Sequence, residues 1–247
     1  MKQQEERAAS VSFPAGLEQP EGSFRFSEDA LLLAQFAASL RLPEHACFAD
    51  LGTGCGVVAL AVLRKRPSWR GVGLEVQPEL AAAAERNAGS LGLSEHFSVV
   101  TGDVAEHASR KAIRAALCVS SEDDGPVLFD AVFCNPPWRR EGTGRVPLSD
   151  MRRRALFGTG RTFTDFFSAS DAVLKNGGHL VAVSGAERTA ELLAALPTRL
   201  HPEHLRFVFT RPSSPAAFVL LRAKKNGRAA LCVDRLDMLG NRSEERF

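Results

Sequence analysis

Tyrosine is absent from this 247-residue chain, and features that mark several protein classes are absent with it. The five cysteines form no Cys-x-x-Cys pair and no Cys/His metal spacing, so we expect reduced thiols and no bound metal. No apolar run is long enough to span a bilayer, and the polar start over residues 1–7 does not resemble a signal peptide. These absences predict a cytoplasmic protein without a membrane partner.

The composition that remains suits one sizeable core. Hydrophobic residues make up 45% of the chain, and a chain of this length buries about 70–75% of its unfolded surface as a single α/β domain. We expect residues 1–21 to be a flexible lead-in and residues 22–247 to form that single domain. The oligomeric state is left open.

The segment D-L-G-T-G-C-G, residues 50–56, lies between a strand-like run and a helical pattern. Glycines at such a turn allow positive φ and let a ligand approach free backbone N–H groups. A nicotinamide dinucleotide site uses G-x-G-x-x-G, whereas these glycines run G-x-G-x-G behind an acid. Asp50 suits a ligand with an ammonium group, such as the methionine end of S-adenosylmethionine. Asp50, Gly52 and Gly54 are therefore candidate residues for binding this methyl donor, and we call residues 50–56 the donor loop. A purely structural tight turn is the alternative.

The next two strands also end in acids. Glu75 ends a strand over residues 71–74 and could accept hydrogen bonds from ribose hydroxyls, or it could simply cap the helix beginning at Pro78. Val76 could pack on an adenine face. Asp103 follows the strand over residues 97–100 and could accept from the adenine amino group, although an N-cap of the following helix is the alternative.

A fourth strand leads into N-P-P-W, residues 135–138. The prolines remove backbone donors and stiffen the loop, so Asn135 and the Pro136 carbonyl could hold both hydrogens of an exocyclic amine for in-line transfer. Trp138 offers a face for stacking a base, a contact worth about 1–3 kcal/mol, and Pro137 completes the substrate side. The alternative is an Asn-Pro turn with a core tryptophan.

D-L-G-T-G-C-G, L-E-V, G-D-V and N-P-P-W, in this order, resemble the class I S-adenosylmethionine-dependent methyltransferases of the N-P-P-aromatic type. The stretch F-R-F-S-E-D-A-L-L-L-A, residues 24–34, is similar to bacterial tRNA (adenine-N6) methyltransferases acting on valine tRNA, and the likeness covers most of residues 22–235. It implies an α/β, Rossmann-like fold: a doubly wound, mostly parallel seven-stranded sheet with helices on both faces. Related adenine enzymes usually carry Tyr or Phe where this chain has Trp138.

The resemblance also implies roles for individual residues. S-adenosyl-L-methionine would be the cofactor, bound by the donor loop and Glu75 with Asp103 at its adenine, while Asn135 and Trp138 would hold the target base. No general base is required, because the nitrogen attacks through its lone pair. Asp29 and Arg25 belong to the same similar stretch but are assigned no role, because Ser27-Glu28-Asp29 is also typical of an ordinary acidic helix start.

Residues 139–161 carry seven arginines and two acids, a local charge of +5 in a chain whose net charge is +2. Arginines beside a base pocket suit a phosphate backbone, so Arg152, Arg153 and Arg154 are candidate RNA contacts. A solvated charged face is the alternative.

The sequence therefore predicts N6 methylation of an adenine in RNA, with tRNA as the partner. Three alternatives stay open: a guanine-N2 rRNA methyltransferase, a protein glutamine-amide methyltransferase, and a noncatalytic RNA-binding module.

Overall fold

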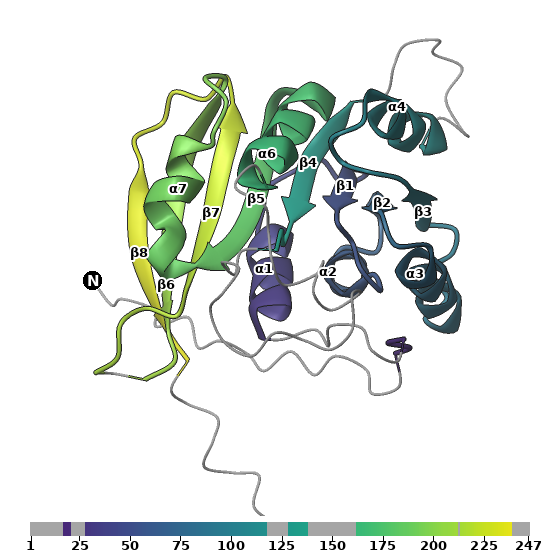
Figure 1. Ribbon diagram of the computed structural model, residues 1–247, viewed down its shortest axis with the longest axis horizontal. Helices are drawn as coiled ribbons and strands as arrows, with labels where there is room; N and C mark the ends of the chain where they lie inside the picture. The colour runs from purple at the N-terminus through teal and green to yellow at the C-terminus, as the bar shows by residue number, and fades with distance from the viewer. Residues whose placement is uncertain (1–16, 21–27, 118–127, 138–161, 212, 239–247) are drawn as a thin grey trace, which may run out of the picture.

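One twisted sheet organises the chain, with its strands in the order β3-β2-β1-β4-β5-β7-β6-β8 (Figure 1). The computed structural model describes residues 17–20, 28–117, 128–137, 162–211 and 213–238. Within these ranges the strands are β1 (Cys47–Leu51), β2 (Arg70–Glu75), β3 (Phe97–Thr101), β4 (Phe129–Cys134), β5 (Leu174–Gly185), β6 (Leu200–Phe209), β7 (Phe218–Lys225) and β8 (Cys232–Asp237). The helices are α1 (Glu28–Ala38), α2 (Val57–Lys65), α3 (Pro78–Ser90), α4 (His107–Ala116), α6 (Thr162–Val173) and α7 (Thr189–Ala194), with a 3-10 turn η2 (Ala186–Arg188).

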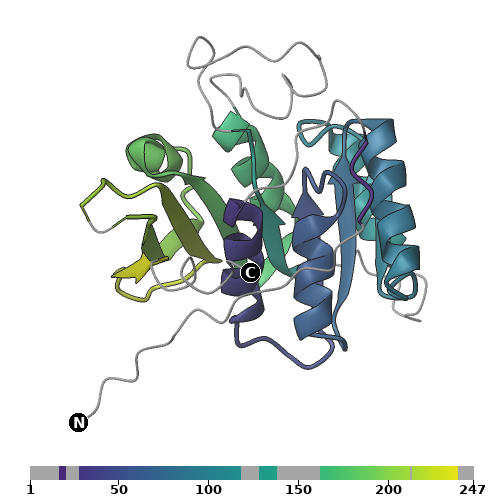
Figure 2. The same cartoon turned by 90° about the horizontal axis from the view of Figure 1, so that it is seen from below.

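Strands β1 to β5 run parallel, and their order reverses between β1 and β4. In open α/β sheets the ligand crevice lies outside the carboxyl ends of the strands at such a reversal. The antiparallel strand β7 points upward in Figure 1, so the carboxyl ends of β1 and β4 face downward there. Figure 2 views the molecule from that side.

Two apolar cores cover the two faces of the sheet. Helices α1, α2 and α3 pack on one face, where Phe48 and Phe133 are fully buried beneath them. Helices α4, α6 and α7 pack on the other face, where Phe129 and Phe167 are fully buried. The central strands read as nearly continuous apolar runs because they are covered on both sides. Figure 2 shows these two layers of helices on opposite sides of the sheet.

The expected doubly wound, mostly parallel sheet with helices on both faces is confirmed, and the sheet has one strand more than expected. The additional strand β8 pairs parallel to β6 at the sheet edge. Three of its six residues are charged, none is fully buried, and Val233 is 58% exposed. This pattern is typical of an edge strand rather than a central one, which is why the sequence signal for it is weak.

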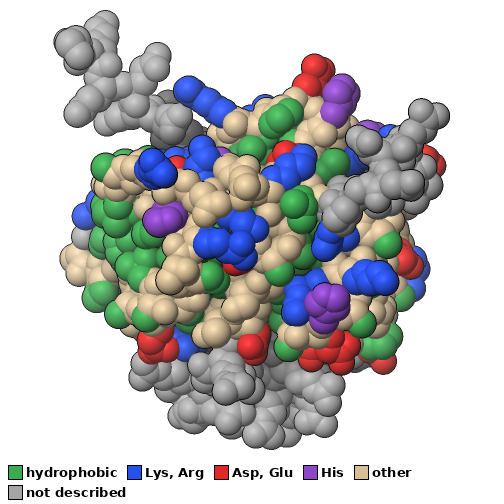
Figure 3. All heavy atoms as spheres, turned by 90° about the horizontal axis from the view of Figure 1, so that it is seen from above, with side chains coloured by type: hydrophobic (Ala, Val, Ile, Leu, Met, Phe, Trp, Pro, Cys, Tyr) green, Lys and Arg blue, Asp and Glu red, His purple; other side chains and the backbone are tan. Residues whose placement is uncertain are grey.

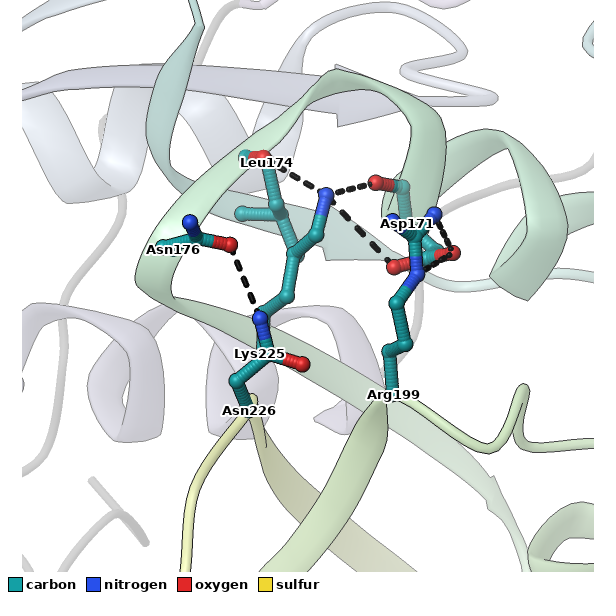
Figure 4. A network of polar contacts seen from close by, with 6 residues as sticks. All are labelled: Asp171, Leu174, Asn176, Arg199, Lys225 and Asn226. Carbon is teal, nitrogen blue, oxygen red and sulfur yellow. Dashed lines mark hydrogen bonds and ion pairs between the residues drawn. The ribbon is translucent and has the colours of Figure 1, made fainter.

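A polar cluster fixes the amino end of β5 to its neighbours (Figure 4). The buried amine of Lys225 at the end of β7 donates to the carbonyl oxygens of Asp171 and Leu174, and Arg199 pairs with the Asp171 carboxylate at 2.6 Å. Asn226 donates to Asn176 at 2.8 Å across the same corner. The cluster satisfies the carbonyls at the end of α6, so it holds the sheet together on the side opposite the crevice.

No helix among the described residues is both long enough and apolar enough to cross a membrane.

Candidate active site

The donor loop turns sharply from β1 into α2 at the crevice. Gly52 and Gly54 have φ angles of 69° and 58°, the left-handed region that favours glycine. The N–H groups of Gly52 and Thr53 both donate to the Leu74 carbonyl, at 2.8 and 3.1 Å, which pins the loop to β2. A Cβ atom on Gly52 would also lie 3.1 Å from the Phe166 ring of α6. This position therefore requires glycine for both its backbone angle and its space.

Asp50, the acid before these glycines, is only 1% exposed. Its Oδ2 accepts a hydrogen bond from the Thr53 hydroxyl at 2.7 Å. The pKa of Asp50 is raised to about 7, mainly by burial and also by the nearby Glu75 carboxylate, while hydrogen bonds from Thr53 and the Ala59 backbone oppose these effects. A cationic ligand at this loop would favour the ionised form, so the carboxylate is suited to respond to such a ligand.

Glu75 connects the ends of the first two strands. One of its carboxylate oxygens accepts the Gly54 N–H at 2.9 Å, and the other accepts the Gln77 N–H at 2.9 Å. Burial raises its pKa, and these backbone donors oppose that effect. A carboxylate offers about four lone-pair sites, so Glu75 can brace the donor loop and still accept from ribose hydroxyls. Next to it Val76 is 50% exposed and available to an apolar ring.

Asp103 is exposed at the end of β3, on the same edge of the sheet. Its Oδ1 accepts the Ala105 N–H at 2.9 Å, whereas the N-cap of α4 is Glu106. Asp103 therefore closes a local turn two residues long and does not cap the helix, contrary to the alternative interpretation of this residue. Its second oxygen is not used in that turn.

Asn87 and residues 17–20 support the donor loop from outside. Asn87, 2% exposed in α3, donates to the Cys55 carbonyl of the loop at 2.9 Å and to the Glu18 carbonyl at 3.0 Å. Its amide oxygen accepts the Glu18 N–H at 2.7 Å, and Glu18 pairs with Arg86 at 2.6 Å. No sequence pattern predicts this contact, because it joins positions 69 residues apart. The boundary between lead-in and domain at residue 22 stays a prediction, since residues 21–27 lie outside the described ranges.

Asn135 and Pro136 follow β4 directly and lie beside the donor loop. In the register of β1 and β4, Leu51 pairs with Cys134, so Gly52 and Asn135 leave adjacent strands at the same level. Neighbouring strands lie about 4.8 Å apart, which places the predicted acceptor side chain next to the predicted donor site. Asn135 is half-buried and its Nδ2 lies 3.4 Å from Oδ2 of Asp29 in α1. Asp29 belongs to the acidic helix start to which the sequence analysis assigned no role.

The other predicted acceptor residues divide into two groups. Pro137 lies within the residues that the structure describes, directly after Pro136, and is half-buried. Trp138 and the arginines at 152–154 lie outside the described residues, so their roles stay predictions.

The cysteines near the site are buried thiols. Burial raises the pKa of Cys55 to about 11 and raises that of Cys134 strongly. Nucleophilic cysteines require a lowered pKa, so both residues are better explained as small core side chains. Among the described residues, no three His, Cys, Asp or Glu side chains gather in a way that could hold a metal ion.

Comparisons with known proteins find methyltransferases. Residues 30–133, which run from α1 to β4, match the precorrin methyltransferase domain. A tRNA1(Val) (adenine(37)-N6)-methyltransferase of Porphyromonas gingivalis is 29% identical over 119 residues, covering 47% of this chain and 42% of that protein. A release factor glutamine methyltransferase of Shewanella oneidensis is 27% identical over 174 residues, covering 68% of this chain and 55% of that protein. The chain thus spans about half the length of these curated relatives.

Among solved structures, a predicted O-methyltransferase from Agrobacterium tumefaciens superimposes with a TM-score of 0.63 and 26% identity, covering 87% of this chain and 90% of that one. The matched family domain, these relatives and the strand order with the donor loop at its reversal point all agree. In both sequence and fold, the chain therefore resembles the class I S-adenosylmethionine-dependent methyltransferases.

Proposed function

We propose that this chain transfers the methyl group of S-adenosyl-L-methionine to the exocyclic N6 amine of an adenine in tRNA. The observation that carries the proposal is the position of Asn135-Pro136-Pro137 at the end of β4, level with the donor loop at the end of β1. Donor and acceptor groups on adjacent strands allow the reacting atoms to be held in line, which is the main source of rate for such a transfer.

Each donor-site residue has a distinct task. The donor loop supplies backbone N–H groups and, through Asp50, a negative charge for the cationic methionine end of the donor. Glu75 accepts from the ribose hydroxyls, while Val76 and Asp103 contact the face and the edge of the donor's adenine. These contacts use the exposed surface of Val76 and the oxygen of Asp103 that its local turn leaves unused.

The acceptor side needs orientation rather than an added base. The Asn135 oxygen and the Pro136 carbonyl each hold one amino hydrogen, so the nitrogen lone pair is turned toward the sulfonium methyl. A carbon–nitrogen bond then forms as the carbon–sulfur bond breaks, and sulfur keeps the electron pair, leaving S-adenosylhomocysteine. The new ammonium loses a proton to water and becomes the neutral methylamine.

The tRNA acceptor is supported by the P. gingivalis relative, whose name specifies adenine-N6 methylation of a tRNA. It is also supported by the arginine-rich sequence of residues 139–161, which directly follows Asn135-Pro136-Pro137-Trp138. On the face of the molecule away from the crevice, Lys and Arg side chains form separate groups rather than one continuous band (Figure 3). We therefore assign the proposed phosphate contacts to Arg152, Arg153 and Arg154. A tRNA substrate also implies a cytoplasmic location.

A glutamine side-chain amide in a release factor is the second candidate acceptor. The S. oneidensis relative, named as a release factor glutamine methyltransferase, covers the larger share of this chain, 68%. A planar amide nitrogen fits the same pair of acceptors, Asn135 and the Pro136 carbonyl.

Incubation with methyl-labelled donor decides between these acceptors. The protein is given total tRNA in one reaction and a purified protein pool containing release factors in another. We expect label in tRNA, recovered as N6-methyladenosine after nucleoside digestion. Label found only in protein would overturn the RNA assignment, and binding of NADH in place of S-adenosylmethionine would overturn the whole proposal.

Salt dependence tests the arginines separately from chemistry. Alanine at Arg152, Arg153 and Arg154 together should weaken tRNA binding and flatten its dependence on salt, by about 0.7–1 in the log–log slope for each lost phosphate contact. Donor affinity should not change. The matched control replaces three exposed cations of α2 and α4, Arg64, Lys65 and Lys111, and should keep the wild-type slope. An unchanged slope in the Arg152–Arg154 variant would mean that these arginines form only a solvated charged face and do not contact RNA phosphates.

A further inference from the structure

Asp29 contacts the side chain that the proposed reaction relies on most. Its Oδ2 lies 3.4 Å from Nδ2 of Asn135, although the two residues are 106 positions apart in the chain. The distance is at the long end for a hydrogen bond, and such contacts often tighten when a substrate is bound. The fold therefore brings a carboxylate from the start of α1 against the amide at the end of β4.

The Asp29 carboxylate is buried rather than part of a solvated helix start. It is only 3% exposed, and its Oδ1 accepts the Ala30 N–H at 3.0 Å. Aspartate is seldom buried without partners, because removing a charge from water costs several kcal/mol. Neighbouring Glu28 shows the ordinary behaviour, since it is exposed on the same helical turn. Asp29 is thus held at this position by the tertiary structure.

A carboxylate determines which way round an adjacent amide can sit. An ionised carboxylate only accepts hydrogen bonds, so the Asn135 side chain must turn its NH2 group toward Asp29. Its oxygen then points away from Asp29. In the reverse orientation, two oxygens with partial or full negative charge would face each other. The contact with Asp29 is enough to explain this orientation of the Asn135 amide.

We propose that Asp29 is a positioning residue that fixes the Asn135 amide with its oxygen toward the acceptor, a role that rests on the proposed function. An amino acceptor brings hydrogens, and these can be held only if Asn135 presents its oxygen. A flipped amide would place NH2 against NH2 and would misalign the nitrogen lone pair. Asp29 therefore selects for acceptors that donate hydrogen bonds, such as an adenine amine or a glutamine amide.

A double-mutant cycle tests whether Asp29 acts through Asn135. Asp29→Asn keeps the size of the side chain but can donate as well as accept, so the Asn135 amide can flip. Its kcat should fall on the order of tenfold, while the affinity for S-adenosylmethionine stays within about twofold. Combining it with Asn135→Ala should slow the reaction no further than Asn135→Ala alone. The matched control Glu28→Gln removes a charge one position away and should keep wild-type kinetics.

Two kinetic results would overturn the assignment. One is full activity in Asp29→Asn, and the other is independent losses that multiply in the double variant. A changed donor affinity with unchanged kcat would instead place Asp29 in donor binding and would also remove the proposed role.

A measurement that needs no turnover separates this proposal from the proposed function. The chain has five asparagines, so 15N-asparagine labelling gives few side-chain amide signals, and the one missing in Asn135→Ala belongs to Asn135. Its NH2 resonances should move in Asp29→Asn and stay in place in Glu28→Gln. An Asn135 signal indifferent to Asp29 would refute the contact. Failure of the wild type to methylate any nitrogen acceptor would refute the proposed function while leaving this contact measurable.

Discussion

Donor binding should depend on pH through Asp50. Its carboxyl is only 1% exposed, and burial raises its pKa to about 7. The donor carries a permanent sulfonium charge and an ammonium group, so it should bind the ionised carboxylate in preference to the protonated one. Protons held by Asp50 in the free enzyme must then be released on binding, and affinity should rise with pH in the range where Asp50 titrates.

The pKa of Asp50 sets the size of the effect. With a pKa of about 7, the ionised fraction grows roughly eightfold between about pH 6 and pH 7.5, and affinity should grow by the same factor. This range lies below the titration of the donor's α-amino group, near pH 7.7–8.0 in model compounds. At pH 7.5 the α-amino group is nevertheless roughly a quarter to two fifths neutral, and the pH dependence that remains in Asp50→Asn measures this contribution.

Titration calorimetry at a series of pH values provides the assay, with Asp50→Asn as the variant. The variant should bind roughly ten- to a hundredfold more weakly at the upper pH, because a charge-assisted hydrogen bond worth about 1.5–3 kcal/mol is lost. It should also lose the part of the pH dependence that Asp50 causes. Glu75→Gln is the companion variant, since burial raises the pKa of Glu75 as well. It should bind more weakly and yet keep the part of the slope that Asp50 causes.

Repeating the titration in buffers with different ionisation enthalpies measures proton release directly. The wild type should release a substantial fraction of a proton near pH 6.5, and Asp50→Asn should release much less. An affinity that is flat over this pH range in the wild type, or a slope that survives undiminished in Asp50→Asn, would refute the reasoning.

Four further outcomes are expected. The folded-state pKa of Asp50, about 7, lies above the ordinary aspartate value of 3.8, so the folded protein retains this proton longer than the unfolded chain. Stability is therefore lost as pH rises from about 4 to about 7, and in thermal melts Asp50→Asn should be more stable than the wild type toward pH 8. Asn135→Ala should keep its donor affinity and lose on the order of a hundredfold or more in turnover, and retained activity would make Asn135 a structural turn residue. Trp138→Ala should raise the KM for the acceptor while Trp138→Phe is mild, whereas loss of folding in both variants would favour a core tryptophan. Asn87→Ala leaves the Cys55 carbonyl without its donor, at a cost of about 1–3 kcal/mol, so both melting temperature and donor affinity should fall, and unchanged affinity would show that the loop holds its shape alone.

Local sequence determined the parts of the site that lie within a few residues of one another. The donor loop could be predicted because glycine spacing, a preceding strand and a following helix are all contiguous, and the structure has Gly52 and Gly54 at positive φ. The ends of β2 and β4 could be predicted for the same reason, since an acid or an asparagine follows an apolar run. Parallel strands then align these ends at one edge, so a list of strand ends already gave most of the candidate site.

Contacts between distant segments were decided only by the tertiary structure. The role of Asp29 stayed open, because the sequence shows that this acid can begin a helix but not which strand end the helix start lies against. Asn87 gave no signal, and its hydrogen bond to the Cys55 carbonyl depends on how α3 packs beside the donor loop. Strand β8 was not predicted either, because its exposed residues resemble a loop in sequence. It forms a strand through its pairing with β6 at the edge of the sheet. The local sequence pattern predicts which helix or strand a residue belongs to. The burial of a side chain and its hydrogen-bond partners depend instead on which helices and strands pack together, and these tertiary contacts orient the side chains of the candidate site.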